Sequence, residues 1–133
     1  MLLRVDASLP VPLWSQIEEG VRRLVAGGGL GPGVPVPSVR ELAQKLRVNP
    51  ATVAKAYQRL GEAGLLEMRR GDGTYVALSP PLMAKSERGR ALRTEAGRYA
   101  AAAITLGARA DEAVDEVRAA WAELTRKGKE DKR

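Results

Sequence analysis

The sequence contains no cysteine and no histidine among its 133 residues. Without cysteine the chain has no disulfide and no thiol nucleophile, and without histidine it lacks the commonest general base and the commonest transition-metal ligand. Carboxylates or lysine alone can support catalysis, but none stands here in a recognisable catalytic arrangement. We therefore expect no enzyme activity, no metal site and no cofactor.

Long apolar runs are also missing, because the longest ones fall far short of the roughly 20 residues that a membrane span needs. The first ten residues, MLLRVDASLP, lack the basic start and the sustained apolar stretch of a signal peptide. We expect a cytoplasmic protein with no membrane partner. The net charge of +6 allows an anionic partner such as DNA. Ten basic and seven acidic residues precede the cut after Leu78, and twelve and nine follow it, so charge alone does not locate a binding face.

Residues 11–26 are predicted to form an amphipathic helix. Apolar side chains recur there at helical spacing, and a charged set that includes Glu18 falls on the opposite, solvent-facing side. The stretch 27–37 holds five glycines and three prolines, which predicts a loop with neither helix nor strand. This loop lacks the Lys-Ser/Thr ending of a phosphate-binding P-loop, so it does not predict a nucleotide site.

A second helix is predicted to begin at Ser38. Its hydroxyl and the carboxylate of Glu41 form a capping box, in which each side chain bonds a free backbone N–H of the first turn. After a short turn at residues 47–48, Asn49 can cap a third helix whose first turn contains Pro50. These two helices stand at helix-turn-helix spacing.

The third helix is predicted to bury Val53, Tyr57 and Leu60 and to end at Gly64 in a left-handed conformation. Beyond it, apolar and charged residues alternate from Leu66, and a second β-prone run follows the turn at residues 70–73. The result is a two-stranded ribbon with a basic tip. Residues 1–78 are therefore predicted to form a winged helix-turn-helix domain with an N-terminal extension, residues 1–10.

The tail, residues 79–133, is predicted to form two helices, which makes the fold mainly α with a small β-hairpin. Their apolar seam would leave about 50 residues with a wide uncovered side, and a second copy of the same element is the simplest cover. The seam could instead fold back onto the chain's own first helix. The predicted dimerisation residues are Leu92, Ala96, Tyr99, Ala103, Leu106, Val114, Val117, Trp121 and Leu124.

The winged-helix layout predicts double-stranded DNA as the partner, because a helix end with exposed polar side chains fits the major groove and a basic wing fits the minor groove. Arg40 could contact a phosphate or a guanine, and the apolar residues of the third helix could meet thymine methyl groups. The predicted DNA-binding residues are Ser38, Arg40, Asn49, Pro50, Ala51, Thr52, Lys55, Gln58, Arg69, Arg70, Gly71, Gly73 and Thr74.

Several of these residues also have a simpler explanation. Asn49 is a leading helix-cap type and needs no DNA to account for it. Lys55 could be an ordinary solvated charge, and Arg40 could belong to a surface ion pair. Gly71 and Gly73 could serve turn geometry alone.

The motifs of residues 31–43, 48–53, 64–66 and 71–76 together resemble the DNA-binding domain of GntR-type transcription regulators. The resemblance covers most of residues 11–78. The string NPATVAKAY at residues 49–57, combined with the short two-helix tail, is similar to the YtrA subfamily in particular. It implies a homodimeric repressor, often of genes for membrane transporters, and it carries over Arg40, Thr52 and the wing glycines as DNA contacts. Many relatives place polar or arginine side chains where this chain has Pro50 and Ala54, so their base readout is not carried over.

The sequence therefore predicts a homodimeric, sequence-specific DNA-binding regulator with a near-palindromic operator. A winged helix that presents its third helix to another protein is the alternative, and it would show a weak dependence on salt. A small-molecule effector stays open, since the short tail leaves little room for a typical pocket and a ligand could bind at the dimer interface.

Overall fold

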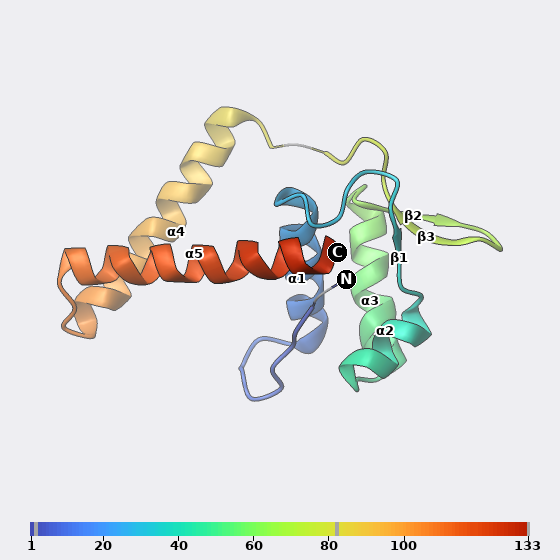
Figure 1. Ribbon diagram of the computed structural model, residues 1–133, viewed down its shortest axis with the longest axis horizontal. Coiled ribbons are helices and arrows are strands. Elements are labelled where there is room, and N and C mark those ends of the chain that lie inside the picture. The colour runs from blue at the N-terminus through green and yellow to red at the C-terminus, as the bar shows by residue number, and fades with distance from the viewer. Residues whose placement is uncertain (2, 82, 133) are drawn as a thin grey trace. The chain divides into compact units, whose positions relative to one another are not determined.

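The computed structural model of the chain describes residues 1, 3–81 and 83–132, and its side chains as far as residue 126 (Figure 1). It divides into two compact units, the first containing Met1–Pro81 and the second Leu82–Arg126. The described residues form, in chain order, α1 (Leu13–Ala26), β1 (Pro35–Val36), α2 (Val39–Leu46), α3 (Pro50–Glu62), β2 (Leu66–Arg69), β3 (Gly73–Val76), α4 (Lys85–Thr105) and α5 (Ala110–Lys132).

The caps predicted for α2 and α3 are confirmed. The Ser38 hydroxyl accepts a hydrogen bond from the Glu41 backbone N–H at 3.1 Å, and the Glu41 carboxylate accepts one from the Ser38 N–H at 3.2 Å. The Asn49 side chain accepts from the Ala51 N–H at 2.9 Å, with Pro50 in the first turn of α3. These bonds satisfy N–H groups that a helix start leaves open, so local sequence fixes where both helices begin.

The core of the first unit is built around α3. Val53, Tyr57 and Leu60 are fully buried, as predicted, and they meet the buried face of α1, which includes Ile17 and Val21. The helix ends before Gly64, which has φ +80° and the left-handed conformation predicted for it. Because α3 contacts both α1 and α2, its position is set by the core and not by a flexible hinge.

The wing contains a strand that the sequence did not predict. The structure has a three-stranded antiparallel sheet in the order β1-β3-β2, and β1 lies within residues 27–37, which were wrongly predicted to hold no strand. β1 is an edge strand, where the missing N–H of Pro35 costs little, and the neighbouring Val34 accepts a backbone bond from Val76 at 2.8 Å. This third strand anchors the base of the β2–β3 hairpin to the body of the unit.

One charged residue of α1 lies inside and not at the surface. Glu18 is only 6% exposed, so its predicted place on the solvent side is wrong. Arg59 of α3 bonds the Glu18 carboxylate at 2.8 Å, and Arg22 bonds it at 3.2 Å. Burying a carboxylate costs desolvation free energy, and the two guanidinium groups that pair with Glu18 offset that cost.

In the second unit, α4 and α5 are connected through Gly107, whose φ of +82° suits the tight turn between them. α4 begins at Lys85, within the tail that was predicted to form two helices. The Tyr99 hydroxyl of α4 donates to the Ala113 carbonyl of α5 at 2.8 Å, and Ala103 is buried between the helices. No helix in the described part of the chain is both long enough and apolar enough to cross a membrane.

We expect Tyr57→Phe to lower the free energy of unfolding by about 1–2 kcal/mol. The Tyr57 hydroxyl donates to the Pro37 carbonyl at 2.7 Å, and burial raises the pKa of Tyr57 above its ordinary value. Removing the hydroxyl leaves that carbonyl without this donor, and urea unfolding would measure the loss. Tyr99→Phe is the control, because Tyr99 is 41% exposed and water can replace its bond. Equal losses in both variants would contradict the structural role of Tyr57.

Candidate nucleic-acid interface

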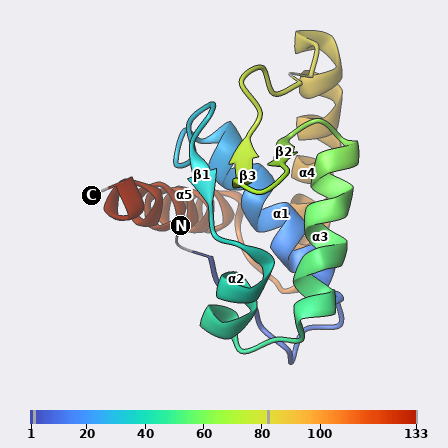
Figure 2. The ribbon, with the colours of Figure 1, turned by 90° about the vertical axis from the view of Figure 1, so that its right-hand side faces the viewer.

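Three elements of the first unit meet on one face. Figure 2 shows α2, α3 and the β2–β3 hairpin on the side that faces the viewer, with α1 behind them. This is the geometry in which a helix start, a second helix and a wing can contact one duplex together. The predicted DNA-binding residues all belong to these elements or to the caps and the turn that adjoin them.

Arg40 stands exposed in the first turn of α2, next to the capping box. The hydroxyl of Ser38 is engaged in that capping box, so its local role is structural. A guanidinium at the start of a helix lies beside backbone N–H groups and the positive end of the helix dipole, and both attract anions. The start of α2 therefore suits a phosphate, with Arg40 as its longest donor.

The outward side of α3 carries short side chains. Ala51, Ala54 and Gln58 are exposed and lie at spacings of three and four, so they share one face. Gln58 donates to Glu62 at 3.3 Å, on the same helix. Asn49 is occupied as a cap, as its simpler explanation expects, while Pro50 is exposed and Thr52 is half-buried. Such a face can approach base edges closely and offers mainly apolar contact.

Lys55 has a partner within the protein. Its ammonium lies 4.4 Å from the ring centroid of Trp14 on α1, and the Arg59 guanidinium lies 4.7 Å from the same centroid. This arrangement is a pair of cation–π contacts on a half-buried indole. The ammonium of Lys55 therefore has an aromatic partner within the protein, while the residue as a whole stays exposed.

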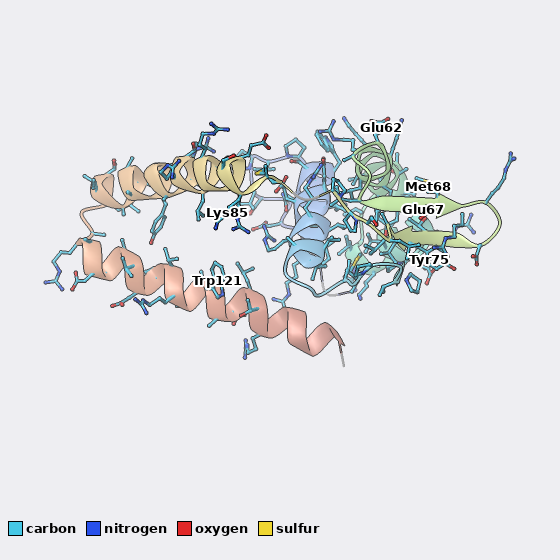
Figure 3. The ribbon with its side chains drawn as sticks, turned by 90° about the horizontal axis from the view of Figure 1, so that it is seen from above. Glu62, Glu67, Met68, Tyr75, Lys85 and Trp121 are labelled. Atoms are coloured by element: carbon cyan, nitrogen blue, oxygen red, sulfur yellow. The ribbon has the colours of Figure 1, made fainter. Side chains whose placement is uncertain are left out.

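The two arginines of the wing differ. Arg69 stacks on the Tyr75 ring at 4.0 Å and lies 3.9 Å from the Glu67 carboxylate, whereas Arg70 is exposed at the turn. Figure 3 shows Glu67 and Tyr75 together on the hairpin. A hydrogen bond to Asp72 raises the pKa of Tyr75 above its ordinary value.

The turn beside Arg70 has the backbone needed for close approach to a phosphate. Gly71 has φ +77° and Gly73 has φ +139°, conformations that other residues rarely adopt. A Cβ at Gly71 would meet nothing within 4 Å, so this glycine serves the turn and not internal packing. Both explanations given for the wing glycines fit this geometry. Thr74 is half-buried at the start of β3.

Sequence reasoning missed Trp14, Glu18 and Arg59 as neighbours of the interface. A signal for them was present, because Lys55 and Arg59 are four residues apart and must share one side of α3. Trp14 and Glu18 show the same spacing on α1. The sequence does not show that these sides of α1 and α3 face each other, because Glu18 and Arg59 are 41 residues apart in the chain.

The pH dependence of stability should reflect Glu18. Burial acts to raise its pKa, but the hydrogen bonds from Arg59 and Arg22 outweigh burial and hold the pKa below its ordinary value of about 4.5. A lowered folded-state pKa means that the stabilisation is complete above the ordinary pKa and is lost as the pH falls through the folded-state value. Glu18→Gln should therefore be less stable than wild type at neutral pH, and the difference should shrink in acid.

Urea unfolding at a series of pH values would measure this difference. Glu19→Gln is the matched control, because Glu19 is the exposed neighbour on the same helix. Its difference from wild type should stay small at every pH. A Glu18→Gln variant with a pH-independent effect would contradict the ionised pairing seen here.

Comparisons with known proteins agree on one family. Residues 13–76 match the family described as "Bacterial regulatory proteins, gntR family". The chain is 40% identical over 76 residues to the HTH-type transcriptional repressor YtrA of Bacillus subtilis (strain 168). That match covers 57% of this chain and 58% of the repressor, so it spans less than two thirds of that relative's length.

Solved structures extend the likeness. The structure of YtrA from Sulfolobus acidocaldarius, a GntR-family transcription factor, is 33% identical with a TM-score of 0.54, and the match covers 91% of this chain and 97% of that one. The crystal structure of AraR(DBD) in complex with operator ORX1 is 29% identical with a TM-score of 0.52, covering 58% of this chain and 96% of that one.

Proposed function

This chain belongs to the GntR family of bacterial regulatory proteins and is a transcription regulator, and we propose that it is a homodimeric repressor of a near-palindromic DNA operator. Its resemblance to YtrA-type members suggests an operon for a membrane transporter as the target. Because its target would be chromosomal DNA, we place it in the cytoplasm. We propose residues 1–78 as the DNA-binding part and residues 79–133 as the dimerisation part.

One observation carries the proposal, namely that α2, α3 and the wing turn open to the same side of the first unit (Figure 2). AraR(DBD), which has a similar fold, is in complex with an operator. By analogy, the start of α3 would enter the major groove, and the wing would follow the neighbouring minor groove. Two such units related by a two-fold axis would read half-sites about 10 to 10.5 base pairs apart.

Within this arrangement Arg40 would contact a phosphate or a guanine, and Arg70 would enter the minor groove. Ala51 and Ala54 would contact thymine methyl groups, while Gln58 could bond a base edge once it leaves Glu62. Arg69 would act mainly by supporting the wing, because Tyr75 and Glu67 already engage it.

The proposed dimer rests on the apolar side chains that the second unit leaves exposed. Leu92 is 69% exposed, Leu106 85% and Trp121 70%, and Figure 3 shows Trp121 on α5. Exposed apolar side chains of this size gain stability when they are covered, and a second copy of the hairpin offers a matching surface. Ala103 differs from the other proposed dimerisation residues, because the hairpin itself buries it.

A selection from a random duplex pool should yield an inverted repeat that wild-type protein binds in an electrophoretic shift assay. Arg40→Ala and Arg70→Ala should each weaken binding by about 5- to 50-fold, because each removes a charged contact of about 1–2 kcal/mol or more. Arg93→Ala is the control, since Arg93 is an exposed arginine of α4. The absence of any selected repeat would refute the proposed function, and normal binding by both variants would refute the proposed face.

Leu92→Glu should shift the protein toward monomer in sedimentation velocity, because a carboxylate would be buried in the proposed seam without a partner. Thr94→Glu is the matched control, because Thr94 lies about half a turn from Leu92 on the same helix. The exposed Thr94 hydroxyl donates to the Arg90 carbonyl of that helix at 3.0 Å. The control should remain dimeric. Identical association of the two variants would place the interface elsewhere.

A further inference from the structure

Two positive charges of α3 lie against a single indole ring. Lys55 and Arg59 approach the Trp14 ring at 4.4 and 4.7 Å from its centroid. Their spacing of four residues places them on the same side of α3, the side that packs next to α1. Two like charges this close repel each other, so the ring and its surroundings must offset that repulsion.

Glu18, on the same helix as Trp14, supplies the negative charge that offsets the repulsion between Lys55 and Arg59. Its nearly buried carboxylate accepts from Arg59 at 2.8 Å, and Arg22 pairs with its other oxygen at 3.2 Å. Trp14 and Glu18 are one helical turn apart, as are Lys55 and Arg59. Two side chains of α1 therefore hold two side chains of α3, and we name this set of four residues the α1–α3 bracket.

We propose that the α1–α3 bracket fixes the rotation of α3 about its own axis, and that Lys55 is a positioning residue that acts through Trp14 without contacting a phosphate. The bracket engages a side of α3 that is distinct from its buried stripe and from its outward face. Helix α3 is thus held at two separate angles around its axis. This inference rests on the proposed function, because it concerns how α3 is presented to DNA.

The short outward side chains make this rotation matter. A lysine or arginine can swing several ångströms to reach a base, but the methyl groups of Ala51 and Ala54 cannot. A rotation of α3 about its axis carries these methyl groups sideways, and alanine has no rotatable side-chain bond that could bring them back to a thymine methyl. A helix that reads DNA with alanine needs its orientation set by the protein, and the bracket is placed to set it.

The experiment compares Lys55→Met, Trp14→Leu and the double variant, with operator duplex and an unrelated duplex at several salt concentrations. Lys55→Met should weaken operator binding about five- to tenfold and leave binding to the unrelated duplex and the salt slope unchanged. Trp14→Leu should have a similar effect, and the double variant should be no weaker than the weaker single variant. Such non-additivity is the signature of a residue that acts through its neighbour.

Lys55→Arg should restore operator binding, because a guanidinium can also lie over the indole. Lys85→Met is the matched control, since Lys85 is an exposed lysine at the start of α4 (Figure 3). Circular dichroism would establish that every variant is folded. If Trp14→Leu fails this check, Trp14→Phe takes its place in the cycle, because it keeps an aromatic ring with weaker attraction for a cation.

Three results would overturn the inference. Equal weakening on both duplexes with a salt slope lower by about 0.9 would make Lys55 a phosphate contact. Additive losses in the double variant would make Lys55 and Trp14 independent, and an unchanged operator affinity for Lys55→Met would leave the bracket without a positioning role. A wild-type protein that prefers no sequence is a different outcome, because it refutes the proposed function itself.

Discussion

The burial of Tyr57 is the constraint on which the rest of the first unit depends. The side chain fills the centre of the core, and its hydroxyl donates to Pro37, the residue just before the Ser38 cap. One residue of α3 is therefore tied to the backbone just before the cap at which α2 begins. Because Arg40 follows within the first turn of α2, this partly buried hydrogen bond helps to set the distance between the two helix starts, together with the exposed turn that connects them.

Three sides of α3 have different roles. One stripe is apolar and buried, a second carries cations that lie against α1, and the outward face is short and mostly uncharged. Few positions remain for long side chains that could bond base edges. On the proposed function, sequence preference would come from close apolar contact, from the start of α2 and from the shape of the minor groove under the wing.

The features that were predictable from sequence are those that depend on residues close together in the chain. The capping box joins positions three apart, the Asn49 cap spans two, and the buried stripe of α3 follows helical periodicity. The missed features depend on distant partners: β1 exists because β3 pairs with it, and Glu18 is buried because Arg59 reaches it. Composition alone correctly marks residues 27–37 as rich in helix breakers, but it cannot reveal an edge strand that tolerates proline.

The short side chains on the outward face of α3 are linked in function to the exposed apolar side of the α4–α5 hairpin, through the proposed dimer. Because the outward face of α3 has few hydrogen-bonding side chains, the binding free energy of one half-site would differ only modestly from that of other sequences. One copy of the protein would therefore discriminate weakly between DNA sequences. On the proposed dimer, binding of the first half-site holds the second unit near its own half-site, which raises its effective concentration and multiplies the two preferences. The apolar hairpin would then be a condition for sequence specificity. The outward face of α3 has few hydrogen-bonding side chains, so a selective protein would need two copies of it in one dimer.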